Sequence, residues 1–249
     1  MNILVLNSGS SSIKYQLFRW PAERPVCSGL VERVGSAQAT ITHQVFDLNT
    51  PAGPSVETQL TLPLADHEAG PCEVVRLLTA APSGVIEHPA DVAVVGHRVV
   101  HGGESFTAAT FITAEVKSEI QRLFGLAPLH NPANYAGIEV AERVFAQARQ
   151  VAVFDTAFHH TLPEYAFRCA LPTALCTEQR IRNYGFHGTS HQYVAAQAAA
   201  YLKARRQAHH PPLRQRVQRG RRARRPVPRY QHGVWAFGGP GNGCPLRRR

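Results

Sequence analysis

Residues 7–14 of the 249-residue chain read NSGSSSIK, a pattern that could bind a phosphate group. A tight Gly/Ser turn exposes backbone N–H groups and hydroxyls at one point, and Lys14, just inside the next apolar run, adds a positive charge. The pattern is not a Walker A motif, because GxxxxGK[ST] is absent and the residues that follow predict a strand. The alternative interpretation is a solvent-facing hairpin turn, which Gly and Ser also favour.

Arg98 follows the apolar run Val92–Val95 and could hold an anionic substrate. It lies in the sequence GHRVVHGGE at residues 96–104, between a buried-strand pattern and a Gly-Gly turn. Open α/β sheets bind ligands at the ends of such strands, and a guanidinium can bind a carboxylate or phosphate through two parallel hydrogen bonds. The alternative is an arginine engaged in a surface ion pair.

Asp155 ends a second apolar run, Val151–Phe154. A carboxylate at the end of a buried strand can orient a metal ion or polarise a bound group. Because Asp is also a common turn residue, its position alone does not distinguish a chemical role from a structural one.

His187 lies between Gly185 and Gly188 in the sequence YGFHGTSH at residues 184–191. Glycines let a ligand approach closely, and an imidazole there could stabilise charge that develops during group transfer. His187 and His191 are four residues apart, but HExxH is absent and no acidic third ligand is near, which disfavours zinc. The main alternative is that this segment only caps a helix.

These four segments are predicted to lie in a mixed α/β fold. Short apolar, β-branched runs bounded by Gly/Ser clusters predict strands, and apolar residues spaced three to four apart predict helices. The predicted strands are Ile3–Leu6, Ile13–Phe18, Pro25–Val34, Ala39–Phe46, Thr58–Leu62, Val92–Val95 and Val151–Phe154. The predicted helices are Cys72–Thr79, Glu115–Phe124, Pro132–Ala148 and His191–Leu202, the last with Thr189 or Ser190 as its N-cap. The first strands should pair antiparallel, beginning with a hairpin.

Charge is distributed unevenly along the chain. Residues 1–202 contain 13 basic and all 17 acidic residues, a balance of −4, whereas residues 203–249 contain 14 basic residues and none acidic. At 44% hydrophobic the chain can bury a core, which excludes a wholly disordered protein. No apolar run is long enough for a membrane span or a signal peptide, so we expect a cytoplasmic protein that binds no membrane. Five cysteines without a CxxC pair argue against a disulfide framework and a structural zinc site.

The four motifs, together with APLHNP at residues 127–132, stand in the order and spacing of the acetate kinase family, which the chain resembles from Met1 to about Leu202. The resemblance implies an α/β fold of the actin-like ATPase (ribonuclease H-like) type, with two domains of which the second is incomplete. It places the first domain at residues 1–149 and the start of the second at residues 150–202. It also implies reversible phosphoryl transfer between ATP and acetate, giving acetyl phosphate and ADP, with Mg²⁺ as a cofactor and a homodimer as the assembly.

The resemblance assigns the N-terminal motif to the nucleotide and its metal. Asn7 is expected to help hold Mg²⁺, and Ser10, Ser12 and Lys14 are expected to surround nucleotide phosphate. Phosphoryl transfer depends on positioning and on neutralising charge, which a lysine and a metal ion can supply.

The later motifs match the family's substrate and catalytic positions. The resemblance implies that Arg98 binds the acetate carboxylate or the moving phosphoryl group, and that Val100 and Leu129 form the small apolar pocket for the methyl group. Asp155 would be the catalytic carboxylate, and His187 would stabilise the transition state. A strong base is unnecessary, because the acetate carboxylate is already a nucleophile.

The resemblance ends after Leu202, where the family continues with a strand and two glycine-containing segments. Residues 203–249 are instead rich in Arg, Pro, Gly and Ala, as when GC-rich DNA is read in a wrong frame. With permitted codons, a reading one base later turns residues 229–249 into a run that begins Asp-Thr-Ser-Met-Gly, and residues 209–219 into one that contains His-Leu-Cys-Gly-Asn-Gly. Both runs resemble the missing family segments. We therefore interpret the tail as frameshifted, and expect it to be disordered because it lacks acids and a periodic apolar face.

A chain without the family's adenosine-binding loop should not turn over, so this chain is expected to be inactive through truncation. Two alternatives stay open. One is a propionate kinase of the same family, because the pocket for the alkyl group is only partly present. The other is a nucleic-acid-binding protein whose basic tail attracts phosphate backbones nonspecifically, although the acidic body disfavours it.

Overall fold

The computed structural model describes residues 1–49, 53–64 and 69–205, so residues 206–249 of the tail predicted to be disordered lie outside the described part. The chain forms two compact units. Unit 1 comprises Met1–His101 and Ala109–Val153, and unit 2 comprises Gly102–Ala108 and Phe154–Arg249. The predicted site residues Asn7 and Arg98 therefore belong to unit 1, and Asp155 and His187 belong to unit 2.

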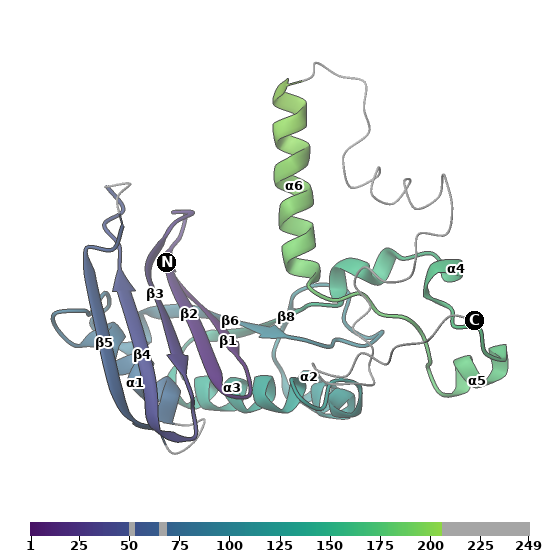
Figure 1. Ribbon diagram of the computed structural model, residues 1–249, viewed down its shortest axis with the longest axis horizontal. Helices are drawn as coiled ribbons and strands as arrows, with labels where there is room; N and C mark the ends of the chain where they lie inside the picture. Colours follow the sequence, from purple (N-terminus) through teal and green to yellow (C-terminus); the bar gives the residue numbers. More distant parts are fainter. Residues whose placement is uncertain (50–52, 65–68, 206–249) are drawn as a thin grey trace, which may run out of the picture. The chain divides into compact units, whose positions relative to one another are not determined.

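Unit 1 is built on an eight-stranded sheet with the strand order β5-β4-β3-β2-β1-β6-β8-β7 (Figure 1). The strands are β1 (Asn2–Ser8), β2 (Ser12–Arg19), β3 (Pro25–Glu32), β4 (Ser36–Val45), β5 (Val56–Leu64), β6 (Val92–Val99), β7 (Thr110–Phe111) and β8 (Arg149–Phe154). The first five strands pair antiparallel in chain order, and β1 pairs parallel with β6. The predicted antiparallel ladder and its opening hairpin are confirmed.

Helices follow the predicted pattern, with additional short turns. The helices are α1 (Ala69–Thr79), η1 (Pro89–Asp91), α2 (Ala114–Arg122), η2 (Leu123–Leu126), α3 (Asn131–Val144), η3 (Ala157–Thr161), α4 (Glu164–Phe167), α5 (Thr173–Glu178) and α6 (Gly188–Arg205). The four predicted helices are confirmed with ends that move by a few residues. The 3-10 turns, α4, α5 and β7 are too short to show a period in the sequence. Within the described part of the chain, no helix has the length and apolar character needed to cross a membrane.

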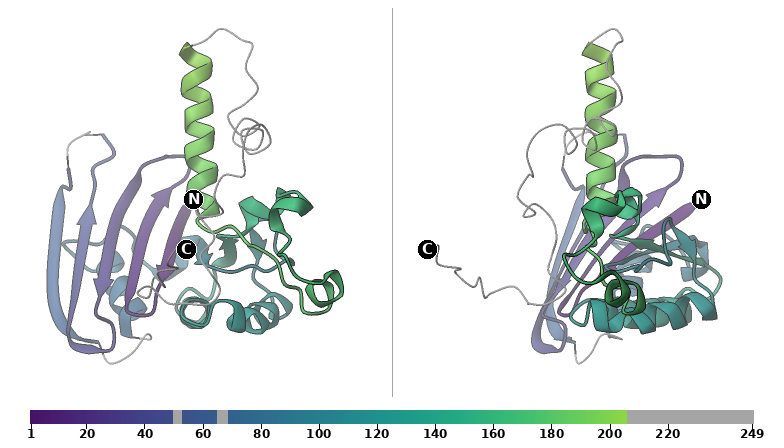
Figure 2. Two further views of the ribbon diagram at one scale, coloured as in Figure 1. Left: turned by 45° about the vertical axis from the view of Figure 1, so that its right-hand side comes forward. Right: turned by 90° about the vertical axis from the view of Figure 1, so that its right-hand side faces the viewer.

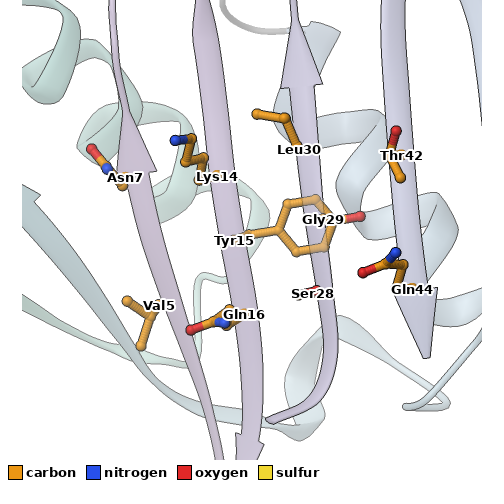
Figure 3. Close-up of a pocket in the computed structure, with 10 residues that line it drawn as sticks. All are labelled: Val5, Asn7, Lys14, Tyr15, Gln16, Ser28, Gly29, Leu30, Thr42 and Gln44. Carbon is orange, nitrogen blue, oxygen red and sulfur yellow. The ribbon is translucent and has the colours of Figure 1, made fainter. Parts of the chain in front are cut away.

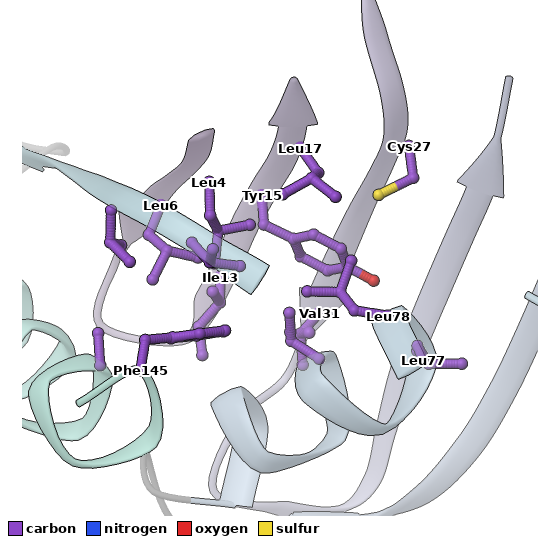
Figure 4. Packing of buried hydrophobic residues seen from close by; sticks show 14 of the residues in the cluster. Leu4, Leu6, Ile13, Tyr15, Leu17, Cys27, Val31, Leu77, Leu78 and Phe145 are labelled. Carbon is purple, nitrogen blue, oxygen red and sulfur yellow. The ribbon is translucent and has the colours of Figure 1, made fainter. Parts of the chain in front are cut away.

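The core of unit 1 lies on one face of the sheet. Successive side chains of a strand point to opposite faces, so Leu4, Ile13 and Leu17 are buried while Lys14 faces outward. Figure 4 shows Leu78 of α1 and Phe145, at the end of α3, packed near these strand side chains. The opposite face of β1 to β4 carries mainly polar side chains, which include Lys14.

A hydrogen-bonded pair is buried within this core. The Tyr15 hydroxyl lies 2.6 Å from His43 Nδ1, and His43 Nε2 lies 3.3 Å from the Ser83 carbonyl oxygen. A carbonyl oxygen only accepts, so Nε2 donates and Nδ1 accepts the tyrosine proton. Burial raises the pKa of Tyr15 and lowers the pKa of His43, which keeps both groups neutral. Gly29 leaves room for the tyrosine ring, because a β-carbon there would overlap it.

Replacing Tyr15 by Phe should lower the free energy of unfolding of unit 1 by about 1–3 kcal/mol. The substitution leaves His43 Nδ1 buried without its donor, and a buried group that loses its partner costs about that much. Urea unfolding of the chain measures the loss. Tyr165→Phe is the matched control because Tyr165 is exposed, and equal urea midpoints for the two variants would contradict the prediction.

Helix α6 begins earlier than the predicted caps allow. Gly188 is its first residue, so Thr189 and Ser190 lie inside the first turn and the prediction of either as N-cap is wrong. The cause is a backbone hydrogen bond, because the Gly188 N–H donates to the Asp155 carbonyl at 2.8 Å. The start of the helix is thereby tied to Asp155 within unit 2.

Candidate active site

Asn7 and Arg98 meet at the carboxyl ends of two parallel strands. The pairing of β1 with β6 sets Leu6 beside His97. Asn7 directly follows Leu6, and Arg98 directly follows His97. Arg98 Nη1 donates to Asn7 Oδ1 at 3.2 Å. Parallel strands bring their carboxyl ends to one edge of a sheet, where α/β proteins bind ligands. The structure thus brings together two of the predicted site residues from segments 91 positions apart.

Lys14 lies on the other side of Asn7, on the antiparallel neighbour β2. The β1–β2 register pairs Asn7 with Lys14 directly. Both line a hollow of about 550 Å³ on the open face of the sheet, together with Gln16, Thr42 and Gln44 (Figure 3). Its lining combines amides, hydroxyls and one ammonium group with a few apolar side chains, which suits a polar or anionic ligand.

The Gly/Ser turn between these strands is closed by its own backbone. The Gly9 N–H donates to the Ser12 carbonyl at 2.7 Å. Ser10 is exposed at the tip of the turn, and Ser12 is half-buried at the start of β2. Their predicted contact with nucleotide phosphate stays a prediction, as does that of Lys14.

Two buried asparagines of α3 hold the strand ends in place. Asn134 Oδ1 accepts from the Val100 N–H at 3.1 Å, and Asn134 Nδ2 donates to the Ser8 carbonyl at 2.5 Å. Asn131 bonds both backbone groups of His101, accepting from its N–H and donating to its carbonyl at 3.0 Å each. The sequence analysis included Asn131 in the APLHNP segment without assigning it a role, and it did not identify Asn134. The available signal was two asparagines three residues apart at the start of a predicted helix.

The two residues predicted for the methyl pocket differ in their surroundings. Val100 is buried and its N–H is held by Asn134. Leu129 lies in the turn before α3 and is 56% exposed. A closed methyl pocket needs apolar walls on several sides, so the assignment of Leu129 remains a prediction.

Asp155 and His187 lie together in unit 2. The Asp155 side chain is only 3% exposed, and its Oδ2 lies 3.8 Å from Nδ1 of the His187 ring, which is 58% exposed. The two side chains form an ion pair only when the imidazole is protonated. A buried carboxylate beside an accessible imidazole leaves the histidine free to meet a ligand.

The backbone at His187 is in the left-handed conformation, with φ of 55°. Few residues other than glycine adopt it, and such conformations concentrate at functional sites. It is held from both sides: Gly188 N–H donates to the Asp155 carbonyl at 2.8 Å, and His159 Nε2 donates to the Phe186 carbonyl at 3.0 Å. The sequence showed the glycines but gave no sign of this backbone strain.

Arg182 connects the His187 segment to the loop after β6. Its guanidinium lies 3.9 Å above the Phe167 ring and 3.5 Å from Glu104 Oε1. In the same loop, the Gly102 N–H donates to Thr156 Oγ1 at 3.0 Å. Polar contacts therefore tie residues 102–108 to the rest of unit 2, including Thr156, which follows Asp155 in the sequence. No sequence motif had indicated these contacts.

The described residues contain no cluster of three His, Cys, Asp or Glu side chains able to hold a metal ion. Asn7 Oδ1 is nevertheless an oxygen of the kind that Mg²⁺ binds. Mg²⁺ at phosphoryl-transfer sites takes most of its ligands from substrate phosphates and water, with one or two from the protein. Asn7 Oδ1 already accepts from Arg98, and with its second lone pair it is the one protein oxygen among the predicted ligands that could face Mg²⁺ arriving with a nucleotide.

Comparison with known proteins matches the model of the Acetokinase family to residues 2–210. The chain is 49% identical over 203 residues to the acetate kinase of Flavobacterium johnsoniae, covering 82% of this chain and 50% of that protein. It is 50% identical over 202 residues to the acetate kinase of Symbiobacterium thermophilum, covering 81% and 49%.

Solved structures show the same fold. The Porphyromonas gingivalis acetate kinase superposes with a TM-score of 0.72 at 39% identity, and a propionate kinase from Francisella tularensis with 0.72 at 35%. Each match covers 81% of this chain and 49% of the other. The predicted actin-like fold with an incomplete second domain is confirmed, and the nucleic-acid alternative finds no support. The chain spans about half the length of the curated relatives it matches, and over that length it belongs to the acetokinase family.

Proposed function

We propose that this chain carries the N-terminal part of an acetate kinase site, which transfers a phosphoryl group between ATP and acetate. The observation that carries the proposal is the Asn7–Arg98 pair, set at the carboxyl ends of two parallel strands and braced by buried asparagines. A guanidinium in a fixed position binds a carboxylate through parallel hydrogen bonds. Acetate, with one carboxylate and one methyl group, suits Arg98 beside the buried Val100.

We assign to unit 2 the stabilisation of the negative charge on the transferred phosphoryl group. His187 is accessible, its ring lies near a buried carboxylate and its backbone is held on both sides. A preorganised imidazole that donates to a developing phosphoryl charge contributes to catalysis because it need not reorganise during the reaction. Asp155 would orient the His187 ring, since its Oδ2 lies 3.8 Å from His187 Nδ1.

In unit 1 we assign four residues to the nucleotide and its metal: Lys14, Asn7, Ser10 and Ser12. Lys14 would neutralise phosphate charge, and Asn7 would offer its amide oxygen to Mg²⁺ bound with ATP. When bound, Mg²⁺ withdraws charge from the phosphate oxygens. ATP, Mg²⁺ and a homodimeric assembly are parts of the proposal that follow from the family, and the predicted cytoplasmic location is a further proposal.

An acetate titration of the full chain followed by NMR tests the carboxylate site. Acetate should shift the Val100 signals, and Arg98→Ala should weaken acetate binding about tenfold or more, because a hydrogen bond to a charged group contributes about 1.5–3 kcal/mol. Arg149→Ala is the control, since Arg149 is an exposed arginine at the start of β8. Equal affinities of the wild-type chain and Arg98→Ala would sink the carboxylate assignment.

The same titration with propionate tests the alternative that the substrate is propionate. The similarity to the Francisella tularensis propionate kinase makes this alternative worth testing. One methylene changes the affinity of an apolar pocket by about 1–3 kcal/mol. Tighter binding of propionate would favour that activity over acetate phosphorylation. A separate assay for ATP-dependent acetyl phosphate should give no product with this chain, and product would refute its predicted inactivity.

A further inference from the structure

One side chain links the two strand ends that carry the Asn7–Arg98 pair. Asn134, in the first turn of α3, is 3% exposed. Its oxygen accepts from the backbone of Val100 at 3.1 Å, and its nitrogen donates to the backbone of Ser8 at 2.5 Å. Ser8 directly follows Asn7, and Val100 lies two residues beyond Arg98. A single amide group therefore connects β1 to the segment after β6 at the edge where the pair lies.

The chemistry of the two bonds requires an amide. One partner is a carbonyl oxygen, which needs a donor, and the other is an N–H group, which needs an acceptor. Both partners are buried backbone groups, so water does not replace a lost bond. An ionised aspartate keeps the shape of the side chain and can still accept from Val100, but it has no hydrogen to donate to Ser8, whereas a protonated one would still donate. Measured at a pH at which its carboxyl is ionised, the Asn134→Asp variant thus breaks the link to β1 alone.

The surrounding packing leaves α3 little freedom to move away from β1. At Gly137, one turn along the helix, a β-carbon would lie closer than 3.0 Å to the Ser8 side chain. Asn131, at the start of the helix, holds both backbone groups of His101. The first half of α3 is therefore a rigid support for both strand ends. In this half of α3, Asn134 is hydrogen-bonded to both strand ends, at Ser8 and at Val100.

We propose that Asn134 is a positioning residue, which sets the distance between Asn7 and Arg98 by tying β1 to the end of β6. The positioning role is supported by the four hydrogen bonds of Asn131 and Asn134 and by the 3.2 Å hydrogen bond between Asn7 and Arg98. The consequence for acetate rests on the proposed function. Residues that lock the geometry of a binding pair raise affinity because the site is already arranged before the ligand enters.

The test compares Asn134→Asp and Asn134→Ala with Ile138→Val in the full chain. Ile138 is a fully buried apolar residue one turn further along α3, so its replacement loosens the packing of the helix and leaves the hydrogen bonds of Asn134 in place. The readouts are the NMR signals of the Asn7 side-chain amide and the Arg98 Nε–H, the acetate affinity, and the urea midpoint. We expect both Asn134 variants to shift the Asn7 and Arg98 signals and to weaken acetate binding at least fivefold.

Ile138→Val should lower the urea midpoint and leave those signals and the acetate affinity unchanged. The proposal is overturned if Asn134→Asp folds with the Asn7 and Arg98 signals of the wild type, or if Ile138→Val shifts them as much. Should Asn134→Asp fail to fold because of its buried charge, Asn134→Ala decides by the same criteria. If both fail to fold while Ile138→Val folds, the role of Asn134 is support of the whole unit and positioning is rejected.

The two proposals fail separately. If acetate leaves the wild-type signals unchanged but the Asn134 variants shift Asn7 and Arg98, the acetate assignment is wrong and the positioning role stands. If acetate binds the wild type and the Asn134 variants equally well, positioning is wrong and the acetate site stands.

Discussion

Unit 1 should lose stability steeply as the pH falls from about 6.5 towards 4. Three of its histidines, His43, His97 and His101, are buried, and burial lowers the pKa of each. The pKa of His101 falls from 6.5 to about 4. As the pH falls, these histidines take up protons in the unfolded chain before they do so in the folded chain. The free energy of unfolding therefore has its full value above pH 6.5 and decreases below it. At about 1.4 kcal/mol per pH unit, His101 alone accounts for about 3 kcal/mol.

Urea titrations between pH 7.5 and 4.5, followed by NMR signals of β1 and β6, measure this loss for unit 1 alone. His101→Asn should flatten the dependence on pH, because it removes one of the three histidines whose pKa is lowered by burial. His130→Asn is the matched control, since His130 is exposed. A free energy of unfolding for unit 1 that stays constant from pH 7.5 to 5 would refute the prediction.

The strands of unit 1 could be predicted because their neighbours in the sheet are also neighbours in sequence. Ile3–Leu6 is a continuous apolar run, Ile13–Leu17 alternates apolar and polar residues, and only a short Gly/Ser turn separates the two segments. A hairpin is then the simplest arrangement that buries one face of both strands. The structure pairs them in that way, from Asn2 opposite Arg19 to Ser8 opposite Ile13.

The supports of the site could not be predicted, because they join residues far apart in the chain. Asn134 reaches Ser8 across 126 positions, and its role depends on the angle at which α3 crosses the strand ends. Nothing in a local pattern specifies that angle. The left-handed backbone at His187 has the same cause, since it is imposed by hydrogen bonds to Asp155 and from His159.

Helix α6 illustrates a different limit. Residues 193–202 include Gln197 as their only polar side chain other than the tyrosine hydroxyls, so apolar groups occur on every side of the helix. Helices of this kind normally lie inside a protein. Yet Tyr193, Val194 and Tyr201 are all exposed on α6, which Figure 2 shows as one continuous helix in light green. Propensity predicted the helix, but its sequence did not predict that these side chains are exposed.

Replacing Gly188 by Ala should destabilise unit 2 by about 2–6 kcal/mol and separate His187 from Asp155. A β-carbon at Gly188 would lie closer than 3.0 Å to the Asp155 carbonyl oxygen and to the Phe158 side chain. Relieving this overlap costs about 1–3 kcal/mol. It also breaks the 2.8 Å hydrogen bond from Gly188, and leaving the buried Asp155 carbonyl without a donor costs about 1–3 kcal/mol more.

Hydrogen exchange of residues 186–192 and the NMR signals of the His187 ring measure the two effects. Exchange at the start of α6 should accelerate, because the hydrogen bond from Gly188 anchors its first turn to Asp155. Gly125→Ala is the control, since a β-carbon at Gly125 meets no atom within 4 Å. If Gly188→Ala exchanges as slowly as the wild type and keeps its His187 signals, then α6 is not anchored by this contact. His187 would have to be held from the side of Phe186 and His159 instead.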